Sequence, residues 1–379
     1  MAIIGNIIKG VINLRNSISG ETDHVRNQKE TLNLLLDKAK ATEFGKHYQF
    51  SKLLKSKQTY QEFKSNIPVF DYDNMHNEWW HRLHKGEDNI TWPGHPDYFA
   101  LSSGTTGKTS KRIPVTDDMI AAIKKAGIQQ ILAIENFDLP ADFFEKEIMM
   151  LGSSTNLETN NDHIEGEISG ISANRIPFWF RGFYKPGEEI SKIDDWDERV
   201  QKIAEQAKTW DIGALSGIPS WIELMLEKVI AYHNAETIHD IWPNLRVYTS
   251  GGVAFSPYEK SFKRLTGNHV EVIDTYLASE GFIALQTRPE TNAMQLLTDN
   301  GIFFEFIPFQ PQYINPDGSL KENSPAISIE DVELNVDYVL IISTVSGAWR
   351  YSIGDTIQFT NTEKAEIKIT GRTKFFLNT

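Results

Sequence analysis

The sequence predicts an α/β fold in which mixed β-sheets are flanked by helices and the last third of the chain is rich in strands. Three observations carry this prediction. Strand and helix patterns alternate between residues 145 and 273, which is typical of partly parallel sheets. No helical pattern of any length follows Leu265. A glycine- and hydroxyl-rich segment, residues 102–111, separates two strand patterns and is the most specific stretch of the chain.

The elements before residue 170 are expected in the following order. An N-terminal helix places its isoleucines on one face and docks on the protein, with attachment to a membrane surface as the alternative. A helix follows over 22–42, capped by Thr22, and Trp79 and Trp80 pack in an aromatic stretch at 66–89. Strands are expected at 98–101, 111–115 and 145–151, with a helix from the N-cap Thr116 to Ile131 between the last two. Residues 156–166 are polar and are predicted as an exposed loop.

The elements after residue 190 alternate more regularly. Helices are expected at 197–210, 221–233 and 257–265, and strands at 211–215, 245–249 and 269–273. From residue 293 onward strands dominate, including 302–307 and 338–343.

Composition excludes several classes of protein. The chain has 379 residues, which fits one large domain or two to three ordinary ones. Its formal net charge of −13 argues against broad nucleic-acid binding. The chain has no cysteine, which excludes disulfides and thiolate chemistry and fits a cytoplasmic protein. No stretch has the apolar length of a membrane-spanning helix. The ten histidines show no metal-ligand spacing, and the oligomeric state stays open.

The segment 102–111 has the composition of a phosphate-binding loop. Glycines let backbone N–H groups approach an anion, hydroxyls add donors, and Lys111 adds a positive charge. The candidate phosphate contacts are Ser102, Ser103, Gly104, Thr105, Thr106, Gly107 and Lys111. A Walker A loop is the first alternative, but it requires glycine where Ser102 stands, and it opens into a helix rather than a strand. A glycine-rich hairpin that binds nothing is the second alternative.

Three further clusters lie at the ends of predicted strands, where α/β sheets often bind ligands. They are residues 248–252, 276–281 and 349–355. We interpret Gly251 and Gly252 with Tyr276 as a flat slot for a base, and Glu280 as a carboxylate for Mg²⁺. Asp355 can accept hydrogen bonds from ribose hydroxyls, although Gly354-Asp355 alone is more often a turn between strands.

The chain resembles the acyl-acid amido synthetases of the plant auxin-responsive (Gretchen Hagen) family, which belong to the adenylate-forming ligases. Residues 102–107 are similar to the family's S-S-G-T-[ST]-x-G loop with one position shortened, and Tyr276 to Glu280 match Y-x-[AS]-S-E. Arg350, Gly354 and Asp355 match Y-R-x-x-x-G-D, with Trp349 in place of the leading aromatic. Residues 371–378 look like the family's hinge. The motifs occur in the family's order and span nearly the whole chain.

The resemblance implies an enzyme that uses ATP and Mg²⁺ to adenylate a carboxylic acid and then transfers the acyl group to an amino acid or another amine. Glu280 and Lys111 would be catalytic, with Glu280 also on the metal. Besides the loop, the nucleotide contacts implied are Ser250, Gly251, Gly252, Tyr276, Ala278, Ser279, Asp355 and Arg372. Residues 1–370 would form the adenylation domain, and residues 371–379 the hinge toward a C-terminal domain that the chain is expected to lack.

Rival functions remain at this point. An acyl-CoA ligase shares the adenylation step and differs in the acceptor. A nucleotide-binding module without catalysis is a second rival, because of the expected missing domain, and a P-loop NTPase is the third. Residues 216–221 and 178–180 are candidate borders of the acyl pocket, with ordinary core packing as the competing interpretation.

Overall fold

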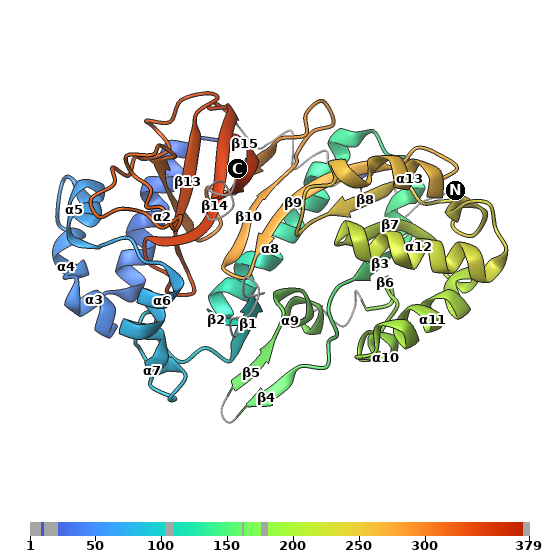
Figure 1. Cartoon of the computed structure of the whole chain (residues 1–379), viewed down its shortest axis with the longest axis horizontal. Coiled ribbons are helices and arrows are strands. Elements are labelled where there is room, and N and C mark those ends of the chain that lie inside the picture. Colours follow the sequence, from blue (N-terminus) through green and yellow to red (C-terminus); the bar gives the residue numbers. More distant parts are fainter. Residues whose placement is uncertain (1–8, 11–21, 103–109, 161–162, 176–180, 374–379) are drawn as a thin grey trace.

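Two β-sheets organise the fold, one of eleven strands and one of four (Figure 1). The computed structural model describes residues 9–10, 22–102, 110–160, 163–175 and 181–373. The isoleucines of the predicted N-terminal helix lie outside these ranges, as do residues 103–109 of the predicted phosphate loop and the aromatic residues 178–180.

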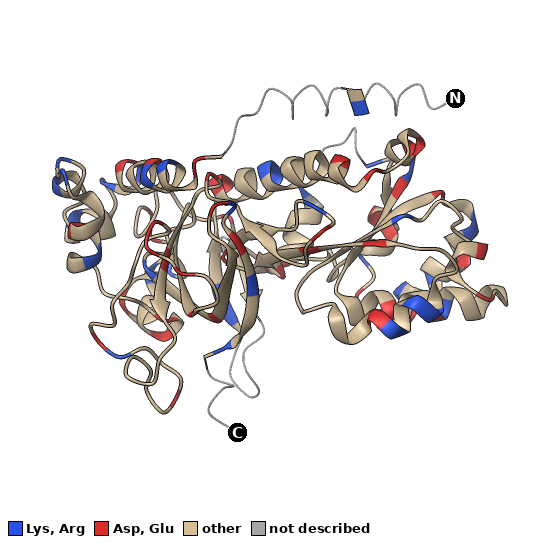
Figure 2. Cartoon of the chain, turned by 90° about the horizontal axis from the view of Figure 1, so that it is seen from above, with Lys and Arg blue, Asp and Glu red and all other residues tan. Residues whose placement is uncertain are grey.

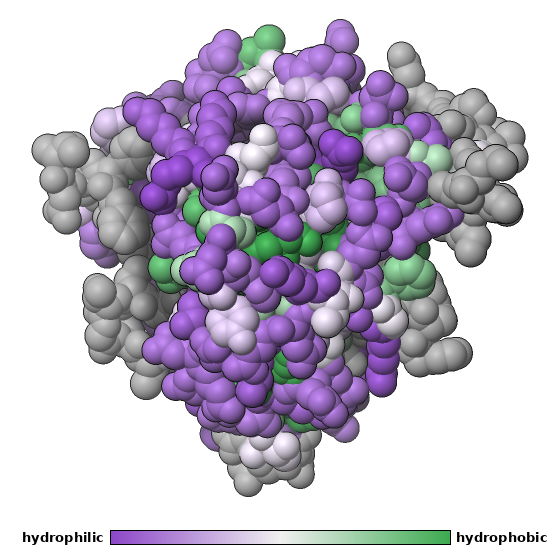
Figure 3. Space-filling model, turned by 90° about the vertical axis from the view of Figure 1, so that its right-hand side faces the viewer, coloured by the Kyte–Doolittle hydropathy of each residue, from purple (hydrophilic) through white to green (hydrophobic). Residues whose placement is uncertain are grey.

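One half of the large sheet is parallel and confirms the alternation of strands and helices. Its strands are β3 (Glu147–Leu151), β6 (Tyr184–Lys185), β7 (Ile212–Gly217), β8 (Val247–Ser250) and β9 (Glu271–Ala278). Helices α11 (Trp196–Gln206), α12 (Pro219–His233) and α13 (Glu259–Leu265) pack their apolar sides against these strands. Viewed from this end, the molecule is mainly hydrophilic, with narrow apolar patches (Figure 3). The helices therefore turn their apolar sides inward.

The other half of the large sheet is antiparallel and begins where β9 pairs with β10. Its strands are β10 (Gly281–Leu285), β11 (Met294–Leu296), β12 (Ile302–Pro308), β13 (Asp337–Thr344), β14 (Tyr351–Asn361) and β15 (Glu366–Arg372). No helix follows Leu265 in the part of the chain that the structure describes, as predicted. Strand β9 runs to Ala278, so Tyr276 to Ala278 form its carboxyl end and Ser279 and Glu280 follow it. The pair Gly354-Asp355 lies inside β14, so the alternative that it forms a turn between strands was wrong.

The N-terminal helices cover the antiparallel half and share its core. They are α2 (His24–Ala39), α3 (Glu43–His47), α4 (Phe50–Leu53), α5 (Thr59–Asn66), α6 (Tyr72–Met75) and α7 (His81–Leu83), with a π-helical turn at His76–Trp80. Trp79 and Trp80 are buried there, as predicted. Helix α2 begins one residue later than expected. Its N-cap is Asp23, whose side chain accepts a hydrogen bond from the N–H of Arg26, and not Thr22.

The small sheet has the order β2-β1-β5-β4 and carries the predicted phosphate loop. Strands β1 (Tyr98–Ser102) and β2 (Lys111–Val115) pair antiparallel, with Ser102 opposite Lys111, so the two ends of the loop are neighbours. The segment after the loop is a strand, which excludes the Walker A arrangement. Helix α8 (Asp117–Ile134) then starts at the predicted cap, since the Thr116 hydroxyl accepts from the N–H of Met119.

The predicted loop at 156–166 is instead a hairpin of β4 (Glu158–Asn160) and β5 (His163–Gly166). The sequence did not indicate strand β5 because its buried side chains, His163 and Glu165, are polar. Glu165 accepts hydrogen bonds from His163 at 2.9 Å and from Arg112 at 2.8 Å, which satisfies the buried carboxylate. Two short helices, α9 (Ile168–Asn174) and α10 (Glu188–Ser191), complete the fold.

Charges are mixed over the surface. Figure 2 shows Lys and Arg interspersed with Asp and Glu along the helices rather than gathered on one face. No helix among the described residues is both long enough and apolar enough to cross a membrane.

Candidate functional site

A cleft of about 1610 Å³ brings together predicted site residues that are far apart in the sequence. It lies where β1, β9, β14 and β15 meet the loops after β7 and β8. The predicted residues on its wall are Ser102, Gly252, Tyr276, Ala278, Ser279, Glu280, Asp355 and Arg372. A site of this size and mixed polarity can hold a nucleotide together with a second small molecule.

Asp355 is the best-anchored carboxylate in the cleft. It is 7% exposed, and one of its oxygens accepts a hydrogen bond from Nε of Arg372 at 2.7 Å. Its other oxygen accepts from the hydroxyl of Tyr276. Asp355 and Arg372 are direct partners across β14 and β15, so the strand register holds them together. Each carboxylate oxygen has a second lone pair, which leaves capacity to accept from a ligand hydroxyl.

The charges in this cluster support one another. Burial raises the pKa of Tyr276, and the neighbouring Asp355 carboxylate raises it further, so the phenol stays a donor. Burial alone would lower the pKa of Arg372, but the attraction of Asp355 outweighs it and the net shift is upward. The cluster is therefore a carboxylate fixed between a neutral donor and a cation.

Glu280 sits at the turn between β9 and β10 and is 8% exposed. Burial raises the pKa of its carboxyl group, and the charge of Lys111 opposes that rise. Lys111 stands at the end of the loop on β2, with its ammonium 5.5 Å from the centre of the Tyr72 ring. The side chain is not on the cleft wall, yet its charge reaches Glu280, which places a cation and an acid at the base of the loop.

The predicted slot at Ser250, Gly251 and Gly252 directly follows β8. A Cβ on Gly251 would lie 2.9 Å from Oγ1 of Thr275, so only glycine fits there without a shift. Gly252 has a φ of +82°, which also favours glycine. Ser250 is fully buried, and its carbonyl accepts from the Thr275 hydroxyl at 2.9 Å, so it supports the slot from beneath rather than lining the cleft.

Asp274 is a cleft residue that the sequence interpretation missed. It pairs with Ser250 across β8 and β9 and lines the cleft. Burial raises the pKa of its carboxyl group. It lies two residues before Tyr276 on β9, and alternate residues of a strand share a face. Had β9 been extended to Ala278, this spacing would have identified Asp274.

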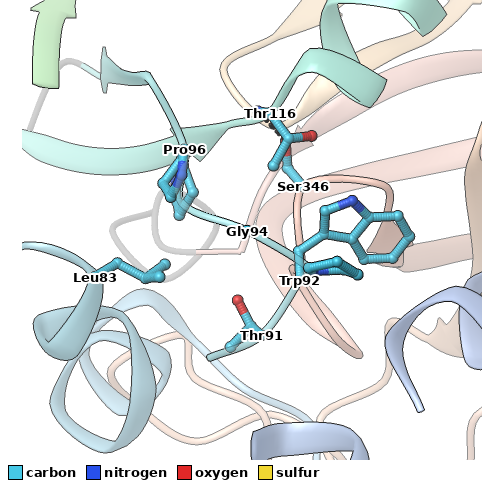
Figure 4. Close-up of a pocket in the computed structure, with 9 residues that line it drawn as sticks. Leu83, Thr91, Trp92, Gly94, Pro96, Thr116 and Ser346 are labelled. Carbon is cyan, nitrogen blue, oxygen red and sulfur yellow. Dashed lines mark hydrogen bonds between the residues drawn. The ribbon is translucent and has the colours of Figure 1, made fainter. Parts of the chain in front are cut away.

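A second cavity is too small to be the site of a substrate. A cavity of about 10 Å³ between Thr91, Trp92 and Ser346 is at most the size of one water molecule (Figure 4). Among the described residues, no group of three or more His, Asp and Glu side chains is placed to hold a metal ion. The candidate border of the acyl pocket is partly on the cleft, through Ile218 and Trp221. Helix α12 begins at Pro219, which occupies its first turn.

Comparisons with known proteins identify the family. Residues 18–202 match the GH3 family N-terminal domain, and residues 295–372 match the GH3 family central domain. The chain belongs to the GH3 family. The resemblance seen in the sequence motifs is therefore confirmed.

Two curated relatives align over most of this GH3 chain. A jasmonoyl-L-amino acid synthetase GH3.5 of Oryza sativa subsp. japonica is 22% identical over 89% of this chain and 68% of that protein. The indole-3-acetic acid-amido synthetase GH3.4 of Arabidopsis thaliana is 22% identical over 88% of this chain and 64% of that protein. The chain thus spans about two thirds of the length of these relatives.

Solved structures confirm the predicted fold. The GH3.15 acyl acid amido synthetase superposes with a TM-score of 0.75 at 16% identity, over 97% of this chain and 72% of that one. A 2-hydroxyisobutyryl-CoA ligase in complex with 2-HIB-AMP and CoA superposes with a TM-score of 0.56 at 12% identity, over 90% of this chain and 73% of that one. The architecture is that of the adenylate-forming ligases.

Proposed function

We propose that the protein is a ligase that adenylates a carboxylic acid with ATP and transfers the acyl group to an amine, in particular that of an amino acid. The observation that carries the proposal is the cleft that joins Ser102, Glu280 and the Asp355 cluster. The GH3 domains and the fold shared with an acyl acid amido synthetase support it. We further propose that residues 1–370 form the ATP- and acid-binding domain and that residues 371–379 act as a hinge.

Each part of ATP has a matching group in this proposal. The loop residues 102–107 and Lys111 hold the phosphates through N–H groups, hydroxyls and one cation. Asp355 accepts from the ribose hydroxyls, and the glycine slot takes the base. Asp274, at the edge of that slot, can accept a hydrogen bond from an exocyclic amine. Ala278 and Ser279 line the wall between the base and the phosphates.

The chemistry needs no nucleophile from the protein. An oxygen of the acid attacks the α-phosphorus, the bond to the bridging oxygen breaks, and pyrophosphate leaves. The amine nitrogen then attacks the acyl carbon, AMP leaves, and the amine releases a proton to water. The protein gathers the reactants and stabilises negative charge as it develops at the α-phosphate, which is the work of Lys111 and the loop donors.

The cleft offers one carboxylate, that of Glu280, which could hold Mg²⁺ together with the phosphates of ATP. Mg²⁺ is usually held by one or two carboxylates together with phosphate oxygens and water, and Glu280 provides one carboxylate beside the loop. Bound there, the ion would neutralise phosphate charge.

The acceptor of the acyl group distinguishes an amide-forming ligase from an acyl-CoA ligase. The protein is incubated with ATP, Mg²⁺, a panel of acids that includes jasmonate and indole-3-acetate, and either amino acids or coenzyme A. Mass spectrometry then identifies the product. We expect an amide. A thioester would assign an acyl-CoA ligase, and neither product together with tight ATP binding would assign a binding module.

A further inference from the structure

Arg199 is a buried cation whose side chain forms no hydrogen bond or ion pair with the residues that the structure describes. It lies on α11 and is 5% exposed. Its Nε has no hydrogen-bond partner, and its guanidinium forms no ion pair with any residue that the structure describes. Buried arginines are normally paired, because an uncompensated charge away from water is strongly unfavourable.

Arg350 is a second buried arginine with which Arg199 can be compared. It is buried to nearly the same degree, at 4% exposed. Its Nε donates to Glu305 at 2.9 Å, and its Nη1 donates to the backbone carbonyl of Lys64 at 2.7 Å and to that of Ile67. The fold thus gives one buried guanidinium three acceptor residues, whereas no residue that the structure describes accepts a hydrogen bond from the other.

The described groups around Arg199 attract its charge but accept no hydrogen bond from it. Its charge lies 5.4 Å from the Trp196 ring, an attraction that uses no N–H donor. Burial lowers the pKa of Arg199, and the charged or ionisable groups that oppose this are Tyr184, Asp194 and Glu167. Tyr184 is hydrogen-bonded to Ser191, and the Asp194 carboxylate accepts a hydrogen bond from Asn156, so both groups have partners other than Arg199.

Two aromatic rings connect Arg199 to one wall of the cleft. The Trp196 ring packs 5.6 Å from that of Trp221, and Trp221 lines the cleft. Glu167 also lines the cleft, and burial raises the pKa of its carboxyl group while Arg199 lowers it. Arg199 itself does not line the cleft, so a ligand there would reach the guanidinium only after the Trp221 or Glu167 side chain moves.

We propose that Arg199 binds a substrate carboxylate other than the one that reacts. This rests on the proposed function, in which one substrate is an acid and the other an amine. The planar guanidinium matches a carboxylate with two parallel hydrogen bonds. The carboxylate belongs either to the acceptor amino acid, whose amine reacts, or to the far end of a dicarboxylic acid.

The first test needs no ligand and no activity. An unpaired buried charge destabilises the fold, so Arg199→Met should raise the melting temperature of the protein. Arg350→Met should lower it, because that change leaves the buried Glu305 carboxylate without its ion pair. If Arg199→Met melts below the wild type or fails to fold, Arg199 is a structural residue and the proposal is overturned.

The second test measures selectivity. Pyrophosphate exchange into ATP is compared for straight-chain dicarboxylates of four to ten carbons against monocarboxylates of equal length. Amide formation is compared for alanine against ethylamine. In one of these two comparisons, the wild type should favour the compound with the extra carboxylate by roughly tenfold or more. The Arg199→Met variant should lose that preference. The Arg199→Lys variant should keep part of it, because lysine retains the charge but not the planar pair of donors.

Lys202→Met is the matched control, since it removes an exposed cation from the same helix and should retain the preference. An unchanged preference in Arg199→Met, or no such preference in either wild-type pairing, would overturn the proposal. Thermal shifts with the same compounds separate this failure from failure of the proposed function. If no acid supports exchange, a carboxylate-dependent shift that is lost only in Arg199→Met still supports the anion site, and the absence of any such shift overturns it.

Discussion

Replacing Asp355 by alanine should weaken ATP binding more than any other single change in the cleft. The substitution removes the carboxylate that we assign to the ribose hydroxyls. A hydrogen bond to a charged group contributes about 1.5–3 kcal/mol, which corresponds to roughly 10- to 150-fold in affinity. It also leaves Arg372 without its ion pair at 2.7 Å and Tyr276 without its acceptor, so the strand ends lose support. Titration calorimetry with ATP measures the change directly.

Three variants make this result interpretable. Asp355→Asn keeps the shape and one acceptor oxygen, so its loss should be smaller. Tyr276→Phe removes one donor to Asp355 and leaves the carboxylate in place, so it tests the support separately. Asp331→Ala, in an exposed loop, should bind ATP as the wild type does. Wild-type affinity in a folded Asp355→Ala protein would refute the assignment of the ribose site.

Four further changes test the rest of the account. Glu280→Gln should reduce the Mg²⁺ dependence of ATP binding, and an intact dependence would place the metal on another carboxylate. Gly251→Ala should weaken ATP binding because its Cβ meets Thr275 Oγ1, and Thr275→Ala in the same chain should restore part of the affinity. Glu305→Ala should lower the free energy of unfolding in urea by about 3–5 kcal/mol, because it leaves the buried Arg350 guanidinium without its carboxylate partner. A loss below about 1 kcal/mol would contradict this. Burial lowers the pKa of His84 to about 4 in the folded protein. As the pH falls, His84 is therefore protonated near pH 6.5 in the unfolded chain but only near pH 4 in the folded protein. The contribution of His84 to stability should therefore be complete above pH 6.5 and fall by about 1–3 kcal/mol toward pH 4, and His84→Phe should make the pH dependence less steep by that amount.

The sequence predicts the parts of the site that depend on local patterns. The strands on either side of the loop follow from short apolar alternation, and the start of α8 follows from one capping hydroxyl at Thr116. The glycines at 251 and 252 mark a close backbone approach that the space around Gly251 explains. These features need only a few neighbouring residues to specify them.

The features that depend on register could not be predicted in this way. Asp355 and Arg372 were named from motifs, but their ion pair requires β14 and β15 to align in one register, which no single segment encodes. The hairpin that contains Glu165 was mistaken for a loop because its buried side chains are polar, and two partners of β5, strand β1 and Arg112, lie more than fifty residues away. The isolation of Arg199 is visible only when its surroundings are known.

The central claim is that this cleft forms an acyl-adenylate, and pyrophosphate exchange into ATP tests it most directly. The full chain is incubated with ATP, Mg²⁺ and labelled pyrophosphate, with and without a panel of carboxylic acids. We predict labelled ATP that appears only when an acid is present and falls in Asp355→Ala. Tight binding of ATP with no exchange for any acid, or exchange that ignores the acid, would contradict the account.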